Sequence, residues 1–172
     1  MRYSLAVRAA IRRFCRANPP RFLCLAGPSG SGKTLLLGAI KIGMEGTPDC
    51  LVLHIEAHAL LGRMLDALKD DSYSFSGFLD AFAQYDALLV DQLEDIGGKE
   101  TCMEEFMHLI RGLLSRGVSV AVALCLRAGR QEDAALYQLL WRRPLCERQY
   151  NLVFSPAGDG WELWEDEPHT PV

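Results

Sequence analysis

The chain has 172 residues, of which 49% are hydrophobic and 23% are charged, so it is long enough for one packed domain and short for two. These fractions are typical of globular proteins and exclude a disordered, collagen-like or coiled-coil chain. No apolar run approaches the roughly 18 residues that a membrane span needs, so we expect a soluble protein. The net charge of −4 excludes a strongly basic protein.

The charge is unevenly distributed along the chain. Residues 1–44 carry eight Lys and Arg and no acid, whereas residues 45–172 carry ten bases and 22 acids. Two interpretations of the basic segment stay open: its arginines attract nucleic acid or an acidic partner, or they line the solvated face of one amphipathic helix. The arginines concerned are Arg2, Arg8, Arg12, Arg13, Arg16 and Arg21.

The six cysteines lie too far apart in sequence for a local zinc site or a Cys-x-x-Cys redox motif. We therefore expect reduced thiols and a cytoplasmic protein. The four histidines are scattered as well, so the sequence predicts no metal site built on cysteine and histidine.

Apolar periodicity alternates between helices and strands. The predicted helices cover residues 3–16, 33–43, 57–69, 75–83, 102–115 and 131–141. The predicted strands cover residues 22–26, 50–55, 87–90, 118–126 and 150–154. Because each strand is apolar throughout rather than at every second residue, the pattern predicts a parallel sheet covered by helices on both faces, a three-layer α/β/α fold.

A glycine-rich segment between the first predicted strand and the next helix has the GxxxxGK[ST] pattern of a phosphate-binding loop. It consists of Gly27, Pro28, Ser29, Gly30, Ser31, Gly32, Lys33 and Thr34, and Leu35 follows it. Glycine lets backbone N–H groups turn inward around a phosphate. We expect Lys33 to contact the β- and γ-phosphates and Thr34 to bind Mg²⁺, so the segment predicts a site for ATP or ADP.

A carboxylate for the Mg²⁺ follows the third predicted strand. Leu88-Leu89-Val90-Asp91 has the form of a Walker B strand, and Asp91 falls at its carboxyl end, where open α/β folds bind their ligands. We therefore predict Thr34 and Asp91 as Mg²⁺ ligands. Lys33, Asp91 and Gln92 are the predicted residues of any hydrolytic chemistry.

The run from Tyr85 to Glu100 places Gly98-Lys99-Glu100 after this strand, and Glu104-Glu105-Phe106 follows it. It resembles the Walker B region of the DnaA family, the bacterial replication initiators and their regulators such as Hda, which belong to the AAA+ ATPases. The resemblance covers roughly residues 2–125. It implies an AAA+ (ASCE) P-loop core over residues 1–155 whose five-stranded parallel sheet has the strand order 5-1-4-3-2.

At two positions to which the resemblance assigns a role, this chain has a different type of residue from the family. The family places a second acid directly after the Walker B Asp, and here Gln92 stands there; an amide can position a water but cannot take its proton. Glu94 or Asp95 are candidate surrogates for that acid. The family's polar sensor 1 position, at the end of the fourth strand, falls on Leu124 or Cys125.

The family's arginine finger would fall on Arg142 or Arg143, for which exposed arginines at a helix C-terminus are the alternative interpretation. The N-terminal residues 2–5 would contribute to adenine binding. The segment that corresponds to the family's single-stranded-DNA surface, about residues 57–82, has only Arg63 and Lys69 as bases, so we expect any DNA binding there to be weak.

The last residues, 156–172, form a short acidic and aromatic tail, too short for the helical lid that follows the family's core. Trp161 and Trp164 within it either bind a partner or belong to a β-hairpin that covers the sheet edge.

Together these features predict a nucleotide-dependent switch or adaptor in replication initiation or its regulation, with weak or no hydrolysis. We expect it to dock on a replication initiator or on its own copies. One alternative is an active helicase-loader ATPase that acts on DNA. Another is a small-molecule P-loop kinase, for which the arginines Arg127, Arg130, Arg142 and Arg143 are suggestive.

Overall fold

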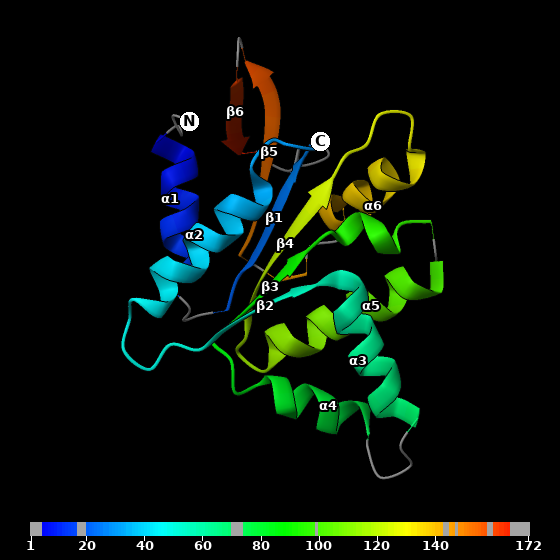
Figure 1. Ribbon diagram of the computed structural model, residues 1–172. Helices are drawn as coiled ribbons and strands as arrows, with labels where there is room; N and C mark the ends of the chain where they lie inside the picture. Colours follow the sequence, from blue (N-terminus) through cyan, green and yellow to red (C-terminus); the bar gives the residue numbers. More distant parts are fainter. Residues whose placement is uncertain are drawn as a thin grey trace, which may run out of the picture.

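The computed structural model describes residues 5–16, 20–69, 74–98, 100–142, 145–146, 148–157 and 160–165. In this part of the chain six strands form one sheet, with helices on both faces (Figure 1). The strands are β1 (Phe22–Gly27), β2 (Val52–Glu56), β3 (Ala87–Asp91), β4 (Ser119–Cys125), β5 (Gln149–Ala157) and β6 (Gly160–Glu165). The helices are α1 (Leu5–Phe14), α2 (Lys33–Glu45), α3 (Ala57–Lys69), α4 (Phe75–Phe82), α5 (Glu100–Ser115) and α6 (Gln131–Arg142), and the 3₁₀ turn η1 (Leu93–Ile96) follows β3.

The strand order across the sheet is β2-β3-β4-β1-β5-β6. The first five strands pair in parallel, so the predicted fold class and the predicted order 5-1-4-3-2 are confirmed. The sheet has one strand more than the predicted five, because β6 pairs antiparallel with β5 at the edge, as in the β-hairpin alternative for the tail. Part of the predicted tail thus extends the sheet: Leu163 is buried in the core while its neighbour Glu162 is exposed, which is the alternation of an edge strand.

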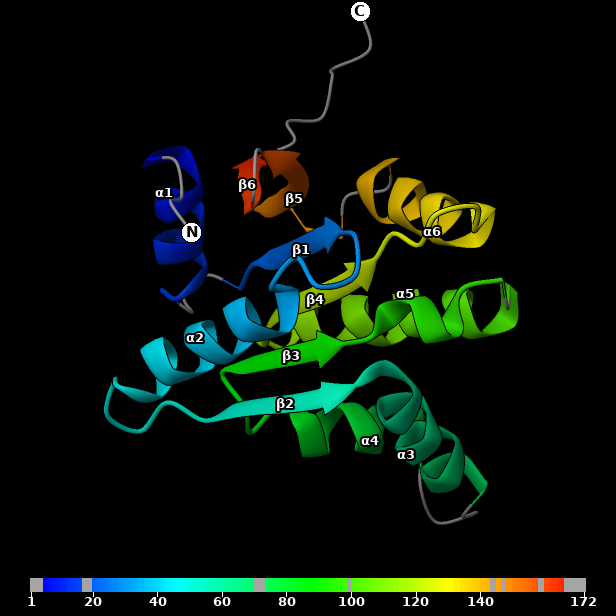
Figure 2. The ribbon, with the colours of Figure 1, turned by 45° about the horizontal axis from the view of Figure 1, so that its top comes forward.

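Each central strand is buried on both faces, which explains its continuous apolar sequence. In β1, Phe22 and Cys24 face one side, which α3, α4, α5 and α6 cover. Leu23 and Leu25 face the other side, which α1 and α2 cover (Figure 2). The phosphate-loop segment therefore follows a strand that is packed against helices on both faces, and this packing holds the start of the loop in place.

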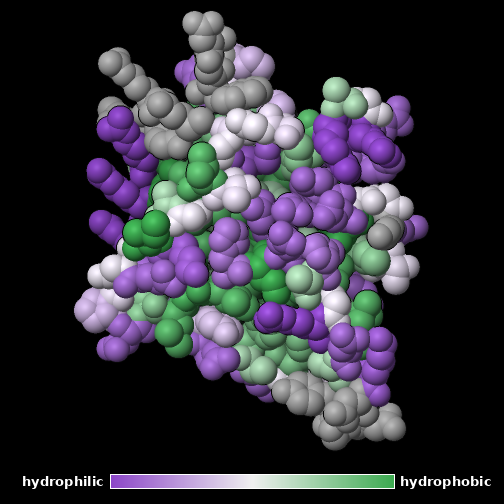
Figure 3. Space-filling view, viewed as in Figure 1, coloured by the Kyte–Doolittle hydropathy of each residue, from purple (hydrophilic) through white to green (hydrophobic). Residues whose placement is uncertain are grey.

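The arginines of the basic N-terminal segment differ in their exposure to solvent. Arg8, Arg12 and Arg13 of α1 and Arg16 just after it are exposed, and hydrophilic side chains cover the position of α1 at the left edge of Figure 3. Arg21 does not share that surface, because only 6% of it is exposed. Its backbone N–H donates to Ser119 Oγ at 3.1 Å and its guanidinium donates to the carbonyl of Arg16, so it anchors the start of β1.

Gly27 ends β1 where the strand passes close to β5. A Cβ at this position would lie 2.6 Å from the Cβ of Phe154, closer than side-chain atoms approach one another. We expect Gly27→Ala to lower the free energy of unfolding by about 1–2 kcal/mol through overpacking. Urea denaturation measures this, with Gly62→Ala in α3 as control, because a Cβ there meets nothing within 4 Å. Equal urea midpoints for Gly27→Ala and the parent would contradict the close approach.

Candidate functional site

The carboxyl ends of β1, β3 and β4 meet at one edge of the sheet. The register pairs Gly27 with Cys125 across β1 and β4, and Glu56 with Asp91 across β2 and β3. The loops that follow these strands enclose a cavity of about 300 Å³. Its walls are Ser29, Gly30, Gly32, Lys33, Thr34, Leu35, Asp91, Gln92, Glu94 and Cys125. The predicted phosphate loop and the predicted Walker B residues are therefore brought together.

Glycines shape the loop that borders this cavity. Gly30 and Gly32 have φ angles of +75° and +94°, which side-chain-bearing residues rarely adopt. Helix α2 begins directly after Gly32, with no side chain capping its N-terminus and no acid in its first turn. The first N–H groups of a helix have no intrahelical partner and carry a partial positive charge, so this end of α2 suits an anion.

Lys33 lies inside the loop and is only 8% exposed. Its Nζ donates to the carbonyls of Gly27 and Pro28 at 2.9 and 2.6 Å, and to Ser31 Oγ at 3.3 Å. These three residues of the predicted loop do not line the cavity, and they hold the lysine instead. Burial lowers the pKa of Lys33, while the nearby ionisable groups of Cys125, Glu94 and Asp91 favour its charged form.

Asp91 stands at the opposite wall and is 7% exposed. One carboxylate oxygen, Oδ1, accepts the N–H of Gln92 at 2.9 Å, and the other lies 4.0 Å from Nε2 of His54. The exposed hydroxyl of Thr34 lies in the same cavity. A hydroxyl and a carboxylate are hard oxygen donors that fit Mg²⁺, which at phosphate sites takes one or two protein ligands and fills its other positions with phosphate and water.

Gln92, the residue in place of the family's second acid, has a φ of 57° and an exposed side chain. Its Nε2 donates to Oε1 of Glu56 at 3.1 Å, so the amide is tied to the end of β2. Glu56 is not among the residues predicted from the sequence. A signal was present, since Glu56 directly follows the apolar run 50–55 and so falls at the same sheet edge as Asp91.

The structure separates the two candidate surrogates for that acid. The side chain of Glu94 lines the cavity, and its Oε2 accepts the backbone N–H of Cys125 at 2.8 Å. Asp95 is exposed outside the cavity wall, with its Oδ2 at 3.8 Å from Nδ1 of His58. Of the two candidate sensor 1 positions, Cys125 lies at the cavity and Leu124 is buried in the core.

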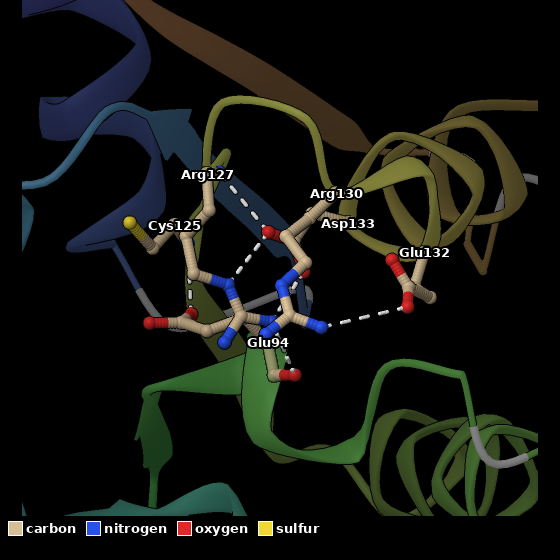
Figure 4. Close-up of polar contacts among 6 residues, drawn as sticks. All are labelled: Glu94, Cys125, Arg127, Arg130, Glu132 and Asp133. Carbon is tan, nitrogen blue, oxygen red and sulfur yellow. Dashed lines mark hydrogen bonds and ion pairs between the residues drawn. The ribbon is translucent and has the colours of Figure 1, made fainter.

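Behind Glu94, Arg127 and Asp133 connect β4 with α6 (Figure 4). Asp133 accepts from Nε and Nη2 of Arg127 at 2.8 and 2.6 Å and from its backbone N–H at 3.0 Å, and Arg127 Nη2 also donates to the carbonyl of Glu94 at 3.3 Å. The hydrogen bond with Asp133 raises the pKa of Arg127, and the same bond lowers the pKa of Asp133. Arg127 therefore has a structural role next to the cavity.

The sequence profile of the bacterial DnaA ATPase domain matches residues 3–130. The chain belongs to the bacterial DnaA ATPase-domain family. DnaA-family members are AAA+ P-loop proteins, and the observed sheet agrees with that assignment. The predicted family membership is thus confirmed.

The DnaA-family chain is similar to the chromosomal replication initiator protein DnaA of Cereibacter sphaeroides (strain ATCC 17029), with 31% identity over 128 residues, which are 73% of this chain and 28% of that protein. It therefore spans little more than a quarter of that relative. Its fold is similar to that of a replication initiator DnaA bound to AMPPCP and single-stranded DNA (TM-score 0.57, 21% identity, 72% of this chain and 38% of that chain). It is also similar to the DnaC helicase loader (TM-score 0.65, 18% identity, 89% and 92%).

Several predicted residues lie outside the described part of the DnaA-family chain. They are residues 2–4 of the predicted adenine contact, Lys99 of the Gly-Lys-Glu segment, the side chain of Arg142, and Arg143. Among the helices that the structure describes, none is long and apolar enough to cross a membrane.

Proposed function

We propose that this chain binds ATP or ADP with Mg²⁺ in the cavity at the sheet edge, and that it acts as a nucleotide-dependent switch or adaptor in replication initiation or its regulation. The observation that carries the proposal is the position of Lys33, buried within the glycine loop at the uncapped start of α2 and across the cavity from Asp91. A cation, free N–H groups and a carboxylate around one cavity are the groups that a magnesium-bound polyphosphate needs.

Each residue has a distinct role in this proposal. Ser29, Gly30 and Gly32 form the backbone cradle, and Gly27 and Pro28 through their carbonyls and Ser31 through its hydroxyl orient the lysine. Lys33 exchanges its loop partners for phosphate oxygens when the nucleotide binds. Thr34 and Asp91 hold the Mg²⁺, and Leu35 covers the cavity rim. A related DnaA was solved with AMPPCP, a nucleotide analogue, which supports the same ligand class here.

We further propose that hydrolysis is weak. Gln92 supplies no base, and its amide is tied to Glu56 rather than free over the cavity. The carboxylate of Glu94 is held by the Cys125 N–H, and Cys125 contributes an apolar thiol where a polar group would contact the γ-phosphate. Loss of one general base or one charge-stabilising group typically lowers a rate by ~10²-fold or more, and both positions differ here.

A replication initiator or further copies of this chain are the proposed partners, with DNA a weak ligand. On the surface expected to meet single-stranded DNA, Lys69 forms an ion pair with Asp66 at 2.8 Å, which reduces the charge available to phosphates. The helicase-loader alternative is favoured by the similarity to the DnaC fold over 89% of this chain. The kinase alternative loses support, because Arg127 and Arg130 are paired with Asp133 and Glu132.

The affinity of the full chain for labelled ATP and ADP, measured with and without Mg²⁺, tests the switch proposal. We expect binding that depends on Mg²⁺, with turnover near background in the presence or absence of single-stranded DNA. Fast turnover that single-stranded DNA stimulates would favour the helicase-loader alternative. Undetectable binding of either nucleotide would contradict the proposal.

Exchanging the amide and the carboxylate at the end of β2 and β3 tests the assignment of weak hydrolysis to Gln92. The double variant Glu56→Gln/Gln92→Glu keeps one amide and one carboxylate at the 3.1 Å contact and places the acid next to Asp91. We expect ATP turnover to rise at least ~10-fold, because a carboxylate can accept a proton from water. Glu56→Gln alone is the control and should leave turnover unchanged. An unaltered rate in the double variant would show that Gln92 does not limit hydrolysis.

A further inference from the structure

Helix α2 carries an exposed apolar stripe on the side that faces away from the sheet. Its inner side packs on the sheet through Leu36, Leu37, Ile40 and Met44, which are all buried. Its outer side carries Leu35 and Ile42, which are 80% and 73% exposed, the two most exposed large apolar residues that the structure describes. A surface helix normally has polar residues on its outer side, whereas in α2 the polar pair Lys41–Glu45 lies beside the apolar stripe.

Small residues surround these two side chains. Gly38 and Gly43 lie within α2, and a Cβ at either position would meet nothing within 4 Å. Glycine inside a helix costs roughly 1 kcal/mol relative to alanine, and the packing of this chain does not require it at either position. Between Leu35 and Ile42 the surface of α2 is formed by Gly38 and the exposed Ala39, so it is low and another helix can approach α2 closely.

The arginines of α1 lie beside this apolar surface. Figure 3 shows the purple side chains over α1 at the left edge and green side chains over the neighbouring α2. Arg8, Arg12, Arg13 and Arg16 line a hollow of about 360 Å³, and within the described part of the chain no carboxylate forms an ion pair with them. All the described residues that line this hollow come from α1 and Arg16, so the cations lie on the helix next to α2 and its apolar stripe.

We propose that this α1–α2 face docks an acidic amphipathic helix of a partner protein. The apolar side of that helix would cover Leu35, Ala39 and Ile42, and its carboxylates would pair with the arginines of α1. Seven residues of α-helix separate Leu35 from Ile42, about 10 Å, which is two turns of a partner helix. Because the arginines of α1 are positively charged, the face favours a partner segment that is negatively charged. The apolar stripe selects a protein helix over a nucleic acid, whose phosphates would meet only the arginines.

Leu35 connects this face with the nucleotide cavity, because it lines the cavity and directly follows Thr34. If the proposed nucleotide binding holds, the two ligands share a residue, and each will then alter the affinity of the other by the same factor. Docking itself does not depend on the nucleotide, so it is tested on nucleotide-free protein.

A designed helical peptide of about 14 residues, four turns, serves as the probe. It carries leucines along one face, flanked by glutamates, and a fluorophore reports binding by anisotropy. We expect the parent chain to bind it, and we expect Ile42→Ser to weaken binding at least ~10-fold, the loss of a buried aliphatic side chain. Arg12→Gln/Arg13→Gln should also weaken binding and reduce its dependence on salt. Leu65→Ser in α3, where Leu65 is 51% exposed, is the matched control and should bind as the parent does.

Three results would overturn the proposal. The first is parental affinity in Ile42→Ser, or an equal loss in Leu65→Ser. The second is equal binding of a peptide that carries lysines in place of the glutamates. Displacement of the acidic peptide by a DNA duplex that binds Arg12→Gln/Arg13→Gln poorly would count in the same way. The third is a dimer in sedimentation that Ile42→Ser dissociates, since a second copy would then occupy the face. Loss of ATP binding with intact peptide binding would contradict only the nucleotide proposal.

Discussion

Lys33→Ala is expected to weaken the binding of Mg·ATP by at least ~100-fold. The ammonium is the one cation on the cavity wall that the structure describes, and hydrogen bonds from a charged donor contribute about 1.5–3 kcal/mol each. Loss of contacts with two phosphates therefore amounts to about 3 kcal/mol or more, which corresponds to a factor of 100 or above. Titration of labelled ATP measures the change.

The variant needs a control for folding, because Lys33 also holds the loop through Gly27, Pro28 and Ser31. Thermal unfolding of Lys33→Ala shows whether the domain persists. Lys41→Ala, later in the same helix, removes a partly exposed lysine that pairs with Glu45 at 3.7 Å, and it should bind ATP as the parent does. A folded Lys33→Ala that retains the parental affinity would show that the phosphate cradle has been assigned wrongly.

Much of the fold was predictable because its signals are local. The continuous apolar strands and the periodic helices each report burial directly, and the phosphate loop needs its glycines at fixed spacing. The strand order followed from the family resemblance, since no local signal encodes which strands become neighbours. The strand β6 was harder to predict, because a short edge strand with only Leu163 buried among the residues whose burial is described gives a weak alternation.

The wall of the site was less predictable than the loop. Sequence spacing could not distinguish Glu94 from Asp95 as the surrogate acid. In the structure the single turn η1 directs Glu94 towards β4 and leaves Asp95 beside His58. The left-handed conformation of Gln92 starts that turn, and its amide is then held by Glu56, which lies 36 residues earlier. Contacts of this range depend on how β2, β3 and β4 align, so they cannot be derived from a local pattern.

The same limit applies to Arg127, which sequence position alone made a candidate phosphate-binding arginine. Its guanidinium forms a bidentate ion pair with the carboxylate of Asp133, whose side chain is 1% exposed. Because this contact lowers the pKa of Asp133 below its ordinary value of 3.8, the pair stabilises the fold above that pH. The stabilisation is lost as the pH falls through the lowered pKa, when the carboxylate is protonated.

Arg127→Ala is therefore expected to lower the free energy of unfolding by about 3 kcal/mol at neutral pH. Removing one partner of a buried pair typically costs ~3–5 kcal/mol, and the lower end applies because 41% of the Arg127 side chain is exposed. Urea denaturation measures the loss. The variant should also lose less stability than the parent as the pH falls below 3.8, because only the backbone N–H of residue 127 and the charge of Arg130 would still lower the pKa of Asp133.

Arg130→Ala is the control for this stability loss. Arg130 lies three residues further along the chain and forms an exposed ion pair with Glu132 at 3.9 Å, so its removal should cost less than ~1 kcal/mol. Arg127 also donates to the carbonyl of Glu94, so its loss should release η1 from β4 and speed amide exchange in η1 and at Cys125. Equal stability of the two variants would mean that Asp133 is held by the α6 N-terminus alone, and the wall of the nucleotide cavity would then be independent of Arg127.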